Sequence, residues 1–245
     1  MDPLILSSSI VENFIAPRKS TSRKGENGIV LVVGGSYIYH GAPILSSLAA
    51  LRTGTDLVYT CVPKINVAST RSVSPNLIVI PLVDQKLTLG AVKKLVGALP
   101  RNLHSATIGM GLAIQEKNSL LHLVKSLLDR DVRLSLDASA LIPEVLPILA
   151  NKNVVVTPHA GEFKRLFGDI PSNSISERIE LVKQNASKYG ITILLKGPPL
   201  KTYTITIPEG LWISETLLSI SSGMVMADSG QIRVDSILML SLIHI

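Results

Sequence analysis

Short apolar runs recur along this chain, and each is followed by a turn of small or polar residues and then by a segment with helical spacing. The clearest run is Ile29–Val33, with five apolar residues in a row and Gly34–Gly35–Ser36 at its end. An apolar run without alternation predicts a strand that is buried on both faces. Further runs of this kind lie at residues 57–62, 77–81, 106–108, 132–136, 154–156 and 191–195.

Segments with apolar residues at helical spacing separate these runs. One begins at Pro43 and stops before Gly54, which suits the preference of proline for a first helical turn and of glycine for a helix end. The others lie at residues 4–15, 66–73, 89–99, 116–129, 142–149, 161–167 and 176–189. This alternation predicts an α/β fold with a mostly parallel central sheet and helices on both faces.

The composition agrees with a large buried sheet. Apolar residues make up 46% of the chain and aromatic residues 4%, so Leu, Ile, Val and Ala must fill the core. Cys61 is the one cysteine, and its apolar surroundings predict a buried, unreactive thiol. No secretory signal or membrane-spanning run is visible, so we expect a soluble cytoplasmic protein without a membrane partner.

The formal net charge of +6 raises the question of which negatively charged partners the chain could bind. The densest basic cluster comprises Arg18, Lys19, Arg23 and Lys24. No aromatic residues or binding motif accompany this cluster, so we expect a solvated segment and no nucleic-acid partner. A modest basic excess would suit anionic small molecules such as nucleotides.

Small and charged residues follow several of the predicted strands. They are Gly34–Gly35, Gly109–Met110–Gly111, Asp137, Thr157–Pro158–His159 and Lys196. The carboxyl ends of parallel strands meet at one edge of a sheet, so we expect these residues, His159 and Lys196 among them, along a common rim. Small residues and helix N-termini favour phosphate, and Lys196 adds a positive charge.

Each of these residues also has a structural explanation. Asp137 could hold a hydrated Mg²⁺ together with Glu162, or it could cap the next helix. Glu162 in a first helical turn also suits the helix dipole. His159 could be a satisfied surface histidine, and Lys196 could extend its charge past the apolar strand into water.

A set of motifs in a fixed order resembles a known family. The motifs are Gly28 to Ser36, Gly41–Ala42–Pro43, Gly109–Met110–Gly111–Leu112, Leu136–Asp137–Ala138, Thr157–Pro158–His159–Ala160–Gly161–Glu162–Phe163 and Leu195–Lys196–Gly197. This set resembles the ADP-dependent NAD(P)H-hydrate dehydratases, repair enzymes with a ribokinase-like fold, over about residues 10–198. The histidine form of the Thr–Pro–His segment is similar to the prokaryotic, ADP-using branch.

The resemblance implies a reaction. ADP, or ATP, would phosphorylate the ring hydroxyl of hydrated NADH or NADPH with the help of Mg²⁺, and elimination of phosphate would restore the reduced cofactor. By the same resemblance, Ala42, Gly111 and His159 contact the hydrated cofactor. The adenine nucleotide would be bound by Lys196, Gly197 and Pro198, and Glu162 would help to arrange Mg²⁺. The family also suggests a homo-oligomer, a tetramer, and a functional link to an NAD(P)H-hydrate epimerase.

The chain departs from the family pattern after Pro198. The family next shows a Gly-Thr-Gly-Asp turn whose aspartate activates the accepting hydroxyl, and this sequence does not contain it. Asp228 is the nearest candidate for that base, with a different spacing, and Ser139 replaces an acidic or glycine residue common in the Asp-Ala segment. We therefore expect an incomplete ribokinase-like domain at residues 1–198 and an atypical, non-native tail at 199–245. If the tail is native after all, we expect the chain to bind its ligands weakly and to lack turnover.

Two other functions compete with the dehydratase. A ribokinase-like kinase of a small molecule, such as a vitamin precursor, would share the sheet and the Mg²⁺ region. A non-catalytic nucleotide-binding module would suit the missing aspartate.

Overall fold

One mixed sheet organises the part of the chain that the computed structural model describes, which is residues 18–171, 174–196, 203–206 and 225–226. Its strand order is β3-β2-β1-β4-β5-β6-β7-β8-β9. Strands β1 to β7 are all parallel, β8 runs antiparallel to β7, and β9 is parallel to β8. The strands are β1 (Ile29–Val33), β2 (Leu57–Pro63), β3 (Leu77–Leu82), β4 (Ser105–Ile108), β5 (Arg133–Leu136), β6 (Val154–Val156), β7 (Thr192–Leu195), β8 (Tyr203–Thr206) and β9 (Val225–Met226).

The seven strands predicted from apolar runs are confirmed, and so is the mostly parallel sheet. Strand β8 has no such prediction, because the sequence from Tyr203 to Thr206 alternates in polarity and follows two prolines. The helices between the strands are α2 (Gly41–Arg52), α3 (Val67–Val73), α4 (Leu89–Ala98), α5 (Lys117–Leu128), α6 (Leu146–Leu149), α7 (Ala160–Phe167) and α8 (Ile175–Tyr189).

The predicted helix at residues 142–149 is wrong in part. The structure has a 3₁₀ turn at Pro143–Val145 followed by the four-residue helix α6. Proline is accepted only in the first turn of a helix, so two prolines four residues apart begin two short helices instead of one long helix. The helix expected at residues 4–15 lies outside the described residues.

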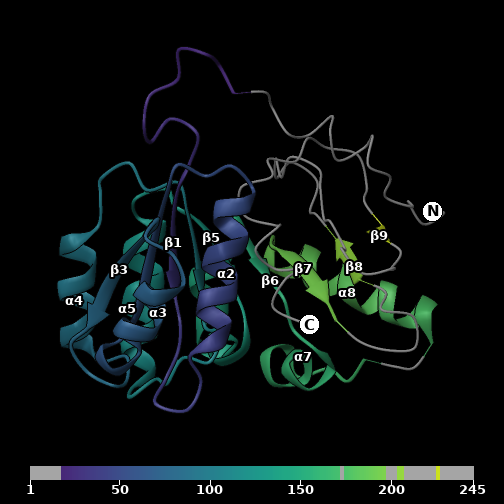
Figure 1. The fold of residues 1–245 in the computed structure, drawn as a ribbon. Helices are drawn as coiled ribbons and strands as arrows, with labels where there is room; N and C mark the ends of the chain where they lie inside the picture. The colour runs from purple at the N-terminus through teal and green to yellow at the C-terminus, as the bar shows by residue number, and fades with distance from the viewer. Residues whose placement is uncertain (1–17, 172–173, 197–202, 207–224, 227–245) are drawn as a thin grey trace.

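Helices cover both faces of the sheet, which gives the predicted three layers (Figure 1). On one face, Leu31 and Val33 of β1 pack in a large cluster with leucines of α4 and α5 and with Phe163 of α7. On the other face, Val30 and Val32 of β1 pack with Ala50 of α2. Alternate residues of β1 therefore serve opposite cores, which explains why this strand has no polar residue.

The α2 side of the sheet becomes polar beyond β1. Ser105, Ser135 and Thr192 lie on this face in β4, β5 and β7, as the strand register shows. Their hydroxyl oxygens are buried and have no hydrogen-bond partner among the described residues. A buried hydroxyl without a partner destabilises the fold, so these positions cost stability.

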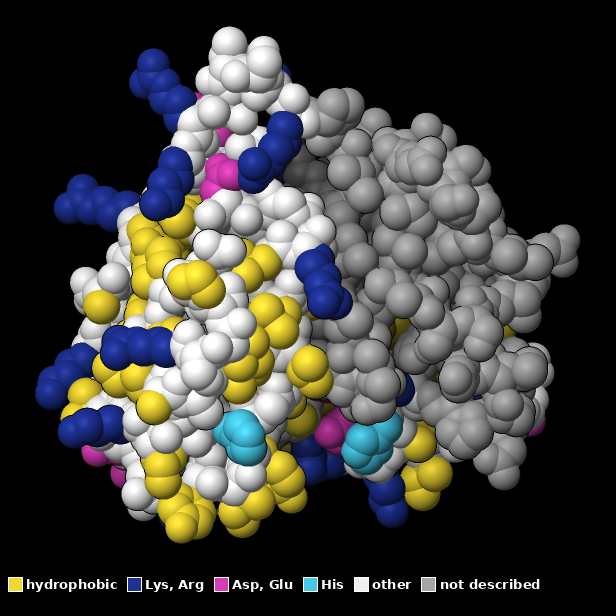
Figure 2. All heavy atoms as spheres, in the orientation of Figure 1, with side chains coloured by type: hydrophobic (Ala, Val, Ile, Leu, Met, Phe, Trp, Pro, Cys, Tyr) yellow, Lys and Arg dark blue, Asp and Glu magenta, His cyan; other side chains and the backbone are white. Residues whose placement is uncertain are grey.

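The surface and the cysteine agree with the sequence analysis. Cys61 is fully buried, which confirms the predicted burial, and this burial raises the pKa of its thiol. Figure 2 shows basic side chains spread over the described face with apolar side chains between them. Within the described ranges, the chain contains no helix with the length and apolar character that crossing a membrane requires.

Candidate active site

Three neighbouring strands end at the same edge of the sheet and bring their polar side chains together. Asp137 follows β5, Thr157 follows β6 and Lys196 follows β7. The Lys196 Nζ atom lies 2.9 Å from Asp137 Oδ1, and the Thr157 hydroxyl donates to the same oxygen at 2.8 Å. The side chains of Lys196 and Asp137 are only 12% and 4% exposed, so water screens this ion pair weakly.

The turn after β5 does not use Asp137 as a helix cap. Asp137 precedes a 3₁₀ turn, but its side chain accepts no capping hydrogen bond, so the capping alternative is wrong. Ala138 has a positive φ of 48°, which is uncommon for a residue with a side chain. Arg165 of α7 holds this turn, since its guanidinium donates to the carbonyls of Ala138 at 2.9 Å and Leu141 at 3.0 Å.

His159 lies directly beside Lys196 at this edge. The two residues form a parallel bridge, and the Lys196 amide donates to the carbonyl of Pro158 at 2.9 Å. His159 is also the N-cap of α7, with its Nδ1 accepting from the amides of Gly161 at 3.0 Å and Glu162 at 3.3 Å. Glu162 completes a capping box, because its Oε2 accepts from the His159 amide at 2.9 Å.

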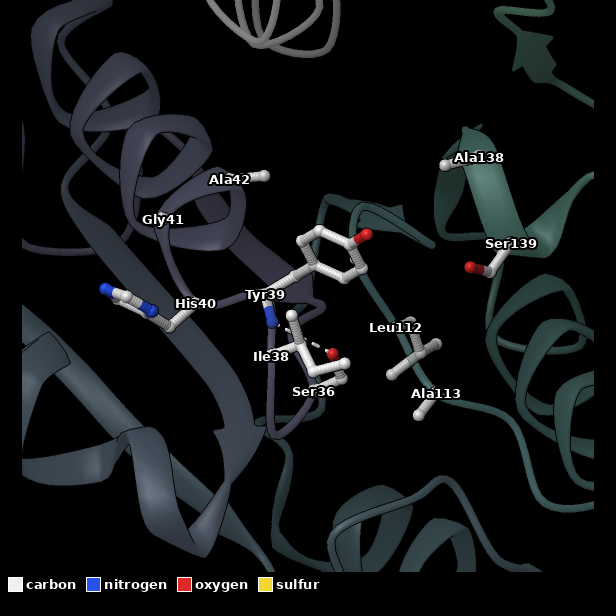
Figure 3. Close-up of a pocket in the computed structure, with 11 residues that line it drawn as sticks. Ser36, Ile38, Tyr39, His40, Gly41, Ala42, Leu112, Ala113, Ala138 and Ser139 are labelled. Atoms are coloured by element: carbon white, nitrogen blue, oxygen red, sulfur yellow. Dashed lines mark hydrogen bonds between the residues drawn. The ribbon is translucent and has the colours of Figure 1, made fainter.

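A cavity of about 710 Å³ lies next to these strand ends (Figure 3). Ala42 and Gly111, both predicted to bind substrate, line it, and Ala138 and Ser139 of the β5 turn form its other side. In Figure 3, the Tyr39 ring extends into the space between these groups, and the Ser139 hydroxyl points into the same space. The volume lies within the usual range for small-molecule sites.

Glycines allow the loops around this cavity to pack against one another. A Cβ atom on Gly109 would lie 1.9 Å from the carbonyl oxygen of Asp137, and the φ of Gly109 is +123°. A Cβ atom on Gly34 would lie 2.6 Å from the carbonyl oxygen of Met110, and one on Gly111 would lie 2.8 Å from the Cβ of Tyr39. Neighbouring loops therefore leave no room for a side chain at these three positions, so packing within the protein explains the glycines without a ligand.

The structure brings the residues that the sequence singled out together in two neighbouring groups. Ala42 and Gly111 line the cavity, whereas Asp137, His159, Glu162 and Lys196 lie at the strand ends beside it and are not among its lining residues. Gly197, Pro198 and Asp228 lie outside the described residues. Sequence reasoning missed Tyr39, which is 64% exposed at the cavity, although an aromatic residue in a glycine-rich loop was a usable signal. It also missed Thr157 as a partner of Asp137, which depends on which strands are neighbours.

The sequence matches a protein family described as NAD(P)H-hydrate dehydratase over residues 30–228. The chain belongs to this family. A similar curated relative is the ADP-dependent (S)-NAD(P)H-hydrate dehydratase of Nitrosopumilus maritimus, which is 84% identical over 192 residues. That match covers 78% of this chain and 67% of the relative, so the chain spans about two thirds of the relative's length.

Solved structures agree with membership of the NAD(P)H-hydrate dehydratase family. The Bacillus subtilis ADP/ATP-dependent NAD(P)H-hydrate dehydratase, co-crystallised with ATP and Mg²⁺, superposes with a TM-score of 0.69 at 27% identity, over 86% of this chain and 71% of that one. A ribokinase-like protein from Enterococcus faecalis superposes with the same TM-score at 22% identity, over 97% of this chain and 77% of that one, and supports the fold alone.

These comparisons confirm the central predictions at the level of the family. The family, its ribokinase-like fold and its reaction class are as expected: a hydro-lyase that acts on hydrated NAD(P)H. ADP or ATP with Mg²⁺ is likewise the expected cofactor set. The roles of the individual site residues stay predictions.

The described residues fit a magnesium ion that arrives with a nucleotide. They contain no group of three or more His, Cys, Asp or Glu side chains that could hold a metal alone. Mg²⁺ usually keeps several waters and takes one or two carboxylates together with substrate phosphates. Asp137 and Glu162 each use one carboxylate oxygen within the protein, and no described residue donates a hydrogen bond to Asp137 Oδ2 or Glu162 Oε1.

Proposed function

We propose that this chain repairs hydrated NADH or NADPH by ADP-dependent dehydration. A phosphoryl group of the nucleotide would pass to the ring hydroxyl, and phosphate would then leave from the ring. Hydroxide is a poor leaving group and phosphate is a good one, which is the reason for the two steps. The observation that carries this proposal is the adjacency of His159 and Lys196 at the strand ends next to a cavity lined by Ala42 and Gly111.

We assign one group of residues at this edge to the nucleotide and another group to the hydrated cofactor. Lys196, with Gly197 and Pro198, would bind the adenine nucleotide, because its ammonium is held at the carboxyl end of β7 by Asp137. Ala42, Gly111 and His159 would bind the hydrated cofactor. Asp137 and Glu162 would supply oxygen ligands to a Mg²⁺ ion that the nucleotide brings. When bound, Mg²⁺ would neutralise charge on the phosphates.

The missing Gly-Thr-Gly-Asp turn affects how much turnover we expect from this chain. We propose that residues 1–198 form the ribokinase-like domain and that 199–245 continue it atypically, although the family match extends to residue 228. Without the family's aspartate, the chain should bind its ligands weakly and lack turnover if this tail is native. Asp228 would be the nearest replacement. Sequencing the source DNA across the Lys196 codon tests the tail, since an uninterrupted frame with the same tail would show that it is native.

A product assay and a binding measurement together separate the three candidate functions. The chain is incubated with hydrated NADH, ADP and Mg²⁺, and both the recovered NADH absorbance and the released inorganic phosphate are measured. Recovery of both supports the dehydratase, and a stable phosphoester in their place supports a small-molecule kinase. ADP binding by calorimetry without any turnover supports a non-catalytic nucleotide-binding module, the alternative that the missing turn favours.

The proposed partners follow from the chemistry of the substrate. The relative's name specifies the S form of the hydrate, so an epimerase would be needed to bring the R form into the same reaction. We also propose a homo-oligomer, a tetramer by family resemblance, which light scattering would measure. The cytoplasmic location stays a prediction.

A further inference from the structure

His159 has a fixed place at the start of α7, and its hydrogen bonds decide which ring nitrogen carries the proton. Its Nδ1 accepts hydrogen bonds from two backbone amides, those of Gly161 and Glu162. A ring nitrogen that accepts a hydrogen bond carries no proton, so a neutral imidazole in this position has its proton on Nε2. The two amides belong to the first turn of α7 and cannot act as acceptors, which excludes the other tautomer as long as this cap is formed.

Gly161 makes this arrangement possible. A Cβ atom at position 161 would lie 3.0 Å from His159 Cε1 and 3.3 Å from its Nδ1, which is tighter than ordinary van der Waals contact. A larger residue would therefore push the ring away from the helix amides. The close approach of ring and backbone depends on the glycine.

Glu162 fixes the same residue from the other side. Its Oε2 accepts from the His159 amide at 2.9 Å, and its Oε1 lies 3.5 Å from His159 Nε2 without forming a hydrogen bond. The Glu162 side chain is largely buried, whereas 58% of the His159 side chain is exposed. No described residue accepts a hydrogen bond from Nε2–H, so this donor is available to a ligand.

On the basis of the function proposed above, we infer that Glu162 is a positioning residue that sets His159 as a hydrogen-bond donor through Nε2–H to the hydrated dinucleotide. The chemical partner is an oxygen atom of that ligand, either of its phosphates or of its hydroxyl or amide groups. A ring with the other tautomer would offer a lone pair, which repels a phosphate or carbonyl oxygen and could only accept from a hydroxyl group. This role is separate from the predicted contact of Glu162 with Mg²⁺, because it acts through the capping box.

Nuclear magnetic resonance of the imidazole nitrogens tests the tautomer directly. The full chain is measured without nucleotide or Mg²⁺ at a pH of about 8, above the ordinary histidine pKa of about 6.5. The His159→Asn variant identifies the His159 signals, because they disappear in its spectrum. We expect a proton on Nε2 and none on Nδ1. A proton on Nδ1, or an equal mixture, would overturn the inference whatever the chain binds.

Matched variants then test Glu162, with hydrate affinity again measured without nucleotide or metal. In Glu162→Gln the side chain still accepts from the His159 amide, so tautomer and affinity should change by less than about twofold. In Glu162→Ala the bond to the His159 amide is lost, which weakens the cap although the backbone amides of residues 161 and 162 can still donate to Nδ1. The tautomer with its proton on Nδ1 should therefore become detectable, and affinity should fall about five- to tenfold. An unchanged tautomer in Glu162→Ala, with or without a fall in affinity, would show that Glu162 does not act through His159.

The His159→Asn variant separates capping from ligand binding. Asparagine is a good N-cap, so the melting temperature should stay close to that of the wild type, whereas hydrate affinity should fall because Nε2–H is gone. Full hydrate affinity in this variant would overturn the donor role. If the wild-type chain binds no hydrate, the proposed function fails, and the tautomer measurement still decides whether His159 is positioned as inferred.

Discussion

Lys196 and Asp137 form an ion pair across an intervening strand, with Nζ and Oδ1 2.9 Å apart. Lys196 follows β7 and Asp137 follows β5, and the Thr157 hydroxyl at the end of β6 donates to the same carboxylate oxygen. Removing one partner of a shielded pair leaves the other charge uncompensated, which costs more than the pair contributes. The pair therefore holds the ammonium at the sheet edge before any nucleotide arrives.

The first prediction concerns the nucleotide. Lys196→Ala should weaken ADP binding by roughly one to two orders of magnitude, because a hydrogen bond to a charged group contributes roughly 1.5–3 kcal/mol. Affinity for hydrated NADPH should change little. Calorimetry with each ligand measures both effects. Lys183→Ala, which removes an exposed lysine of α8, is the control and should bind ADP like the wild type. Equal losses of both affinities in Lys196→Ala would contradict the assignment.

The second prediction concerns His159→Ala, which should show the reverse selectivity. Hydrate affinity should fall while ADP affinity is retained, and loss of the N-cap should lower the free energy of unfolding by about 1 kcal/mol. Calorimetry and denaturant unfolding measure the two effects. His122→Ala on the exposed side of α5 is the matched control. Unchanged hydrate affinity in the His159 variant would count against its role.

The third prediction concerns a glycine that loop packing requires. Gly109→Ala should destabilise the protein by more than about 3 kcal/mol or prevent folding, because the new Cβ would overlap the Asp137 carbonyl at an unfavourable positive φ. Gly97→Ala in α4 has open space around it and should raise the free energy of unfolding by roughly 0.4–1 kcal/mol. Thermal unfolding of both variants provides the measurement, and similar melting temperatures would refute the packing argument.

The fourth prediction uses the buried hydroxyls. Ser135→Ala should be neutral or stabilising by about 1 kcal/mol, because the Ser135 hydroxyl is buried and no residue in the described part of the chain forms a hydrogen bond with it. Ser47→Ala should destabilise by about 1–3 kcal/mol, because that hydroxyl bonds to the Pro43 carbonyl and to Thr60 Oγ1, each at 2.7 Å. Denaturant unfolding compares the two, and the opposite order would show that Ser135 has an unseen partner.

The fifth prediction is a dependence of stability on pH at Asp56, whose side chain is 9% exposed. Burial works to raise its pKa, but hydrogen bonds from Asn27 and Gly25 and the charge of Arg18 outweigh burial, so the pKa lies below its usual value of 3.8. A carboxyl with a lowered pKa stabilises the fold above its usual pKa, and this contribution is lost as the pH falls through the native pKa.

The Asp56→Asn variant should therefore be less stable than the wild type at neutral pH, by roughly 1–3 kcal/mol. The difference should shrink as the pH approaches about 3, where the unfolded carboxyl becomes protonated. Urea unfolding of both proteins over this range gives the result. A difference that stays constant down to low pH would mean that the Asp56 charge is not its source.

Local patterns in the sequence determined the seven parallel strands β1 to β7, most of the helices and the edge of the sheet at which the site lies. An apolar run such as Ile29–Val33 predicts a strand because burial on both faces is a property of the run itself. The ordered motifs determined the family for the same reason, since each motif is a short stretch of chain. Proline spacing at residues 143 and 147 was also visible, and its effect on the helix was underestimated.

Tertiary structure alone decided which side chains are partners. Asp137 could have capped a helix, and only the order β5-β6-β7 brings it to Lys196, which is 59 residues away in the chain. Tyr39 lines a cavity that residues from other loops complete, and position 109 must be glycine because the Asp137 carbonyl, from another loop, lies where a Cβ atom would be. Apolar periodicity is local and can be derived from a segment by itself. The partner of a buried charge depends on contacts between distant segments, which the sequence of neither segment contains.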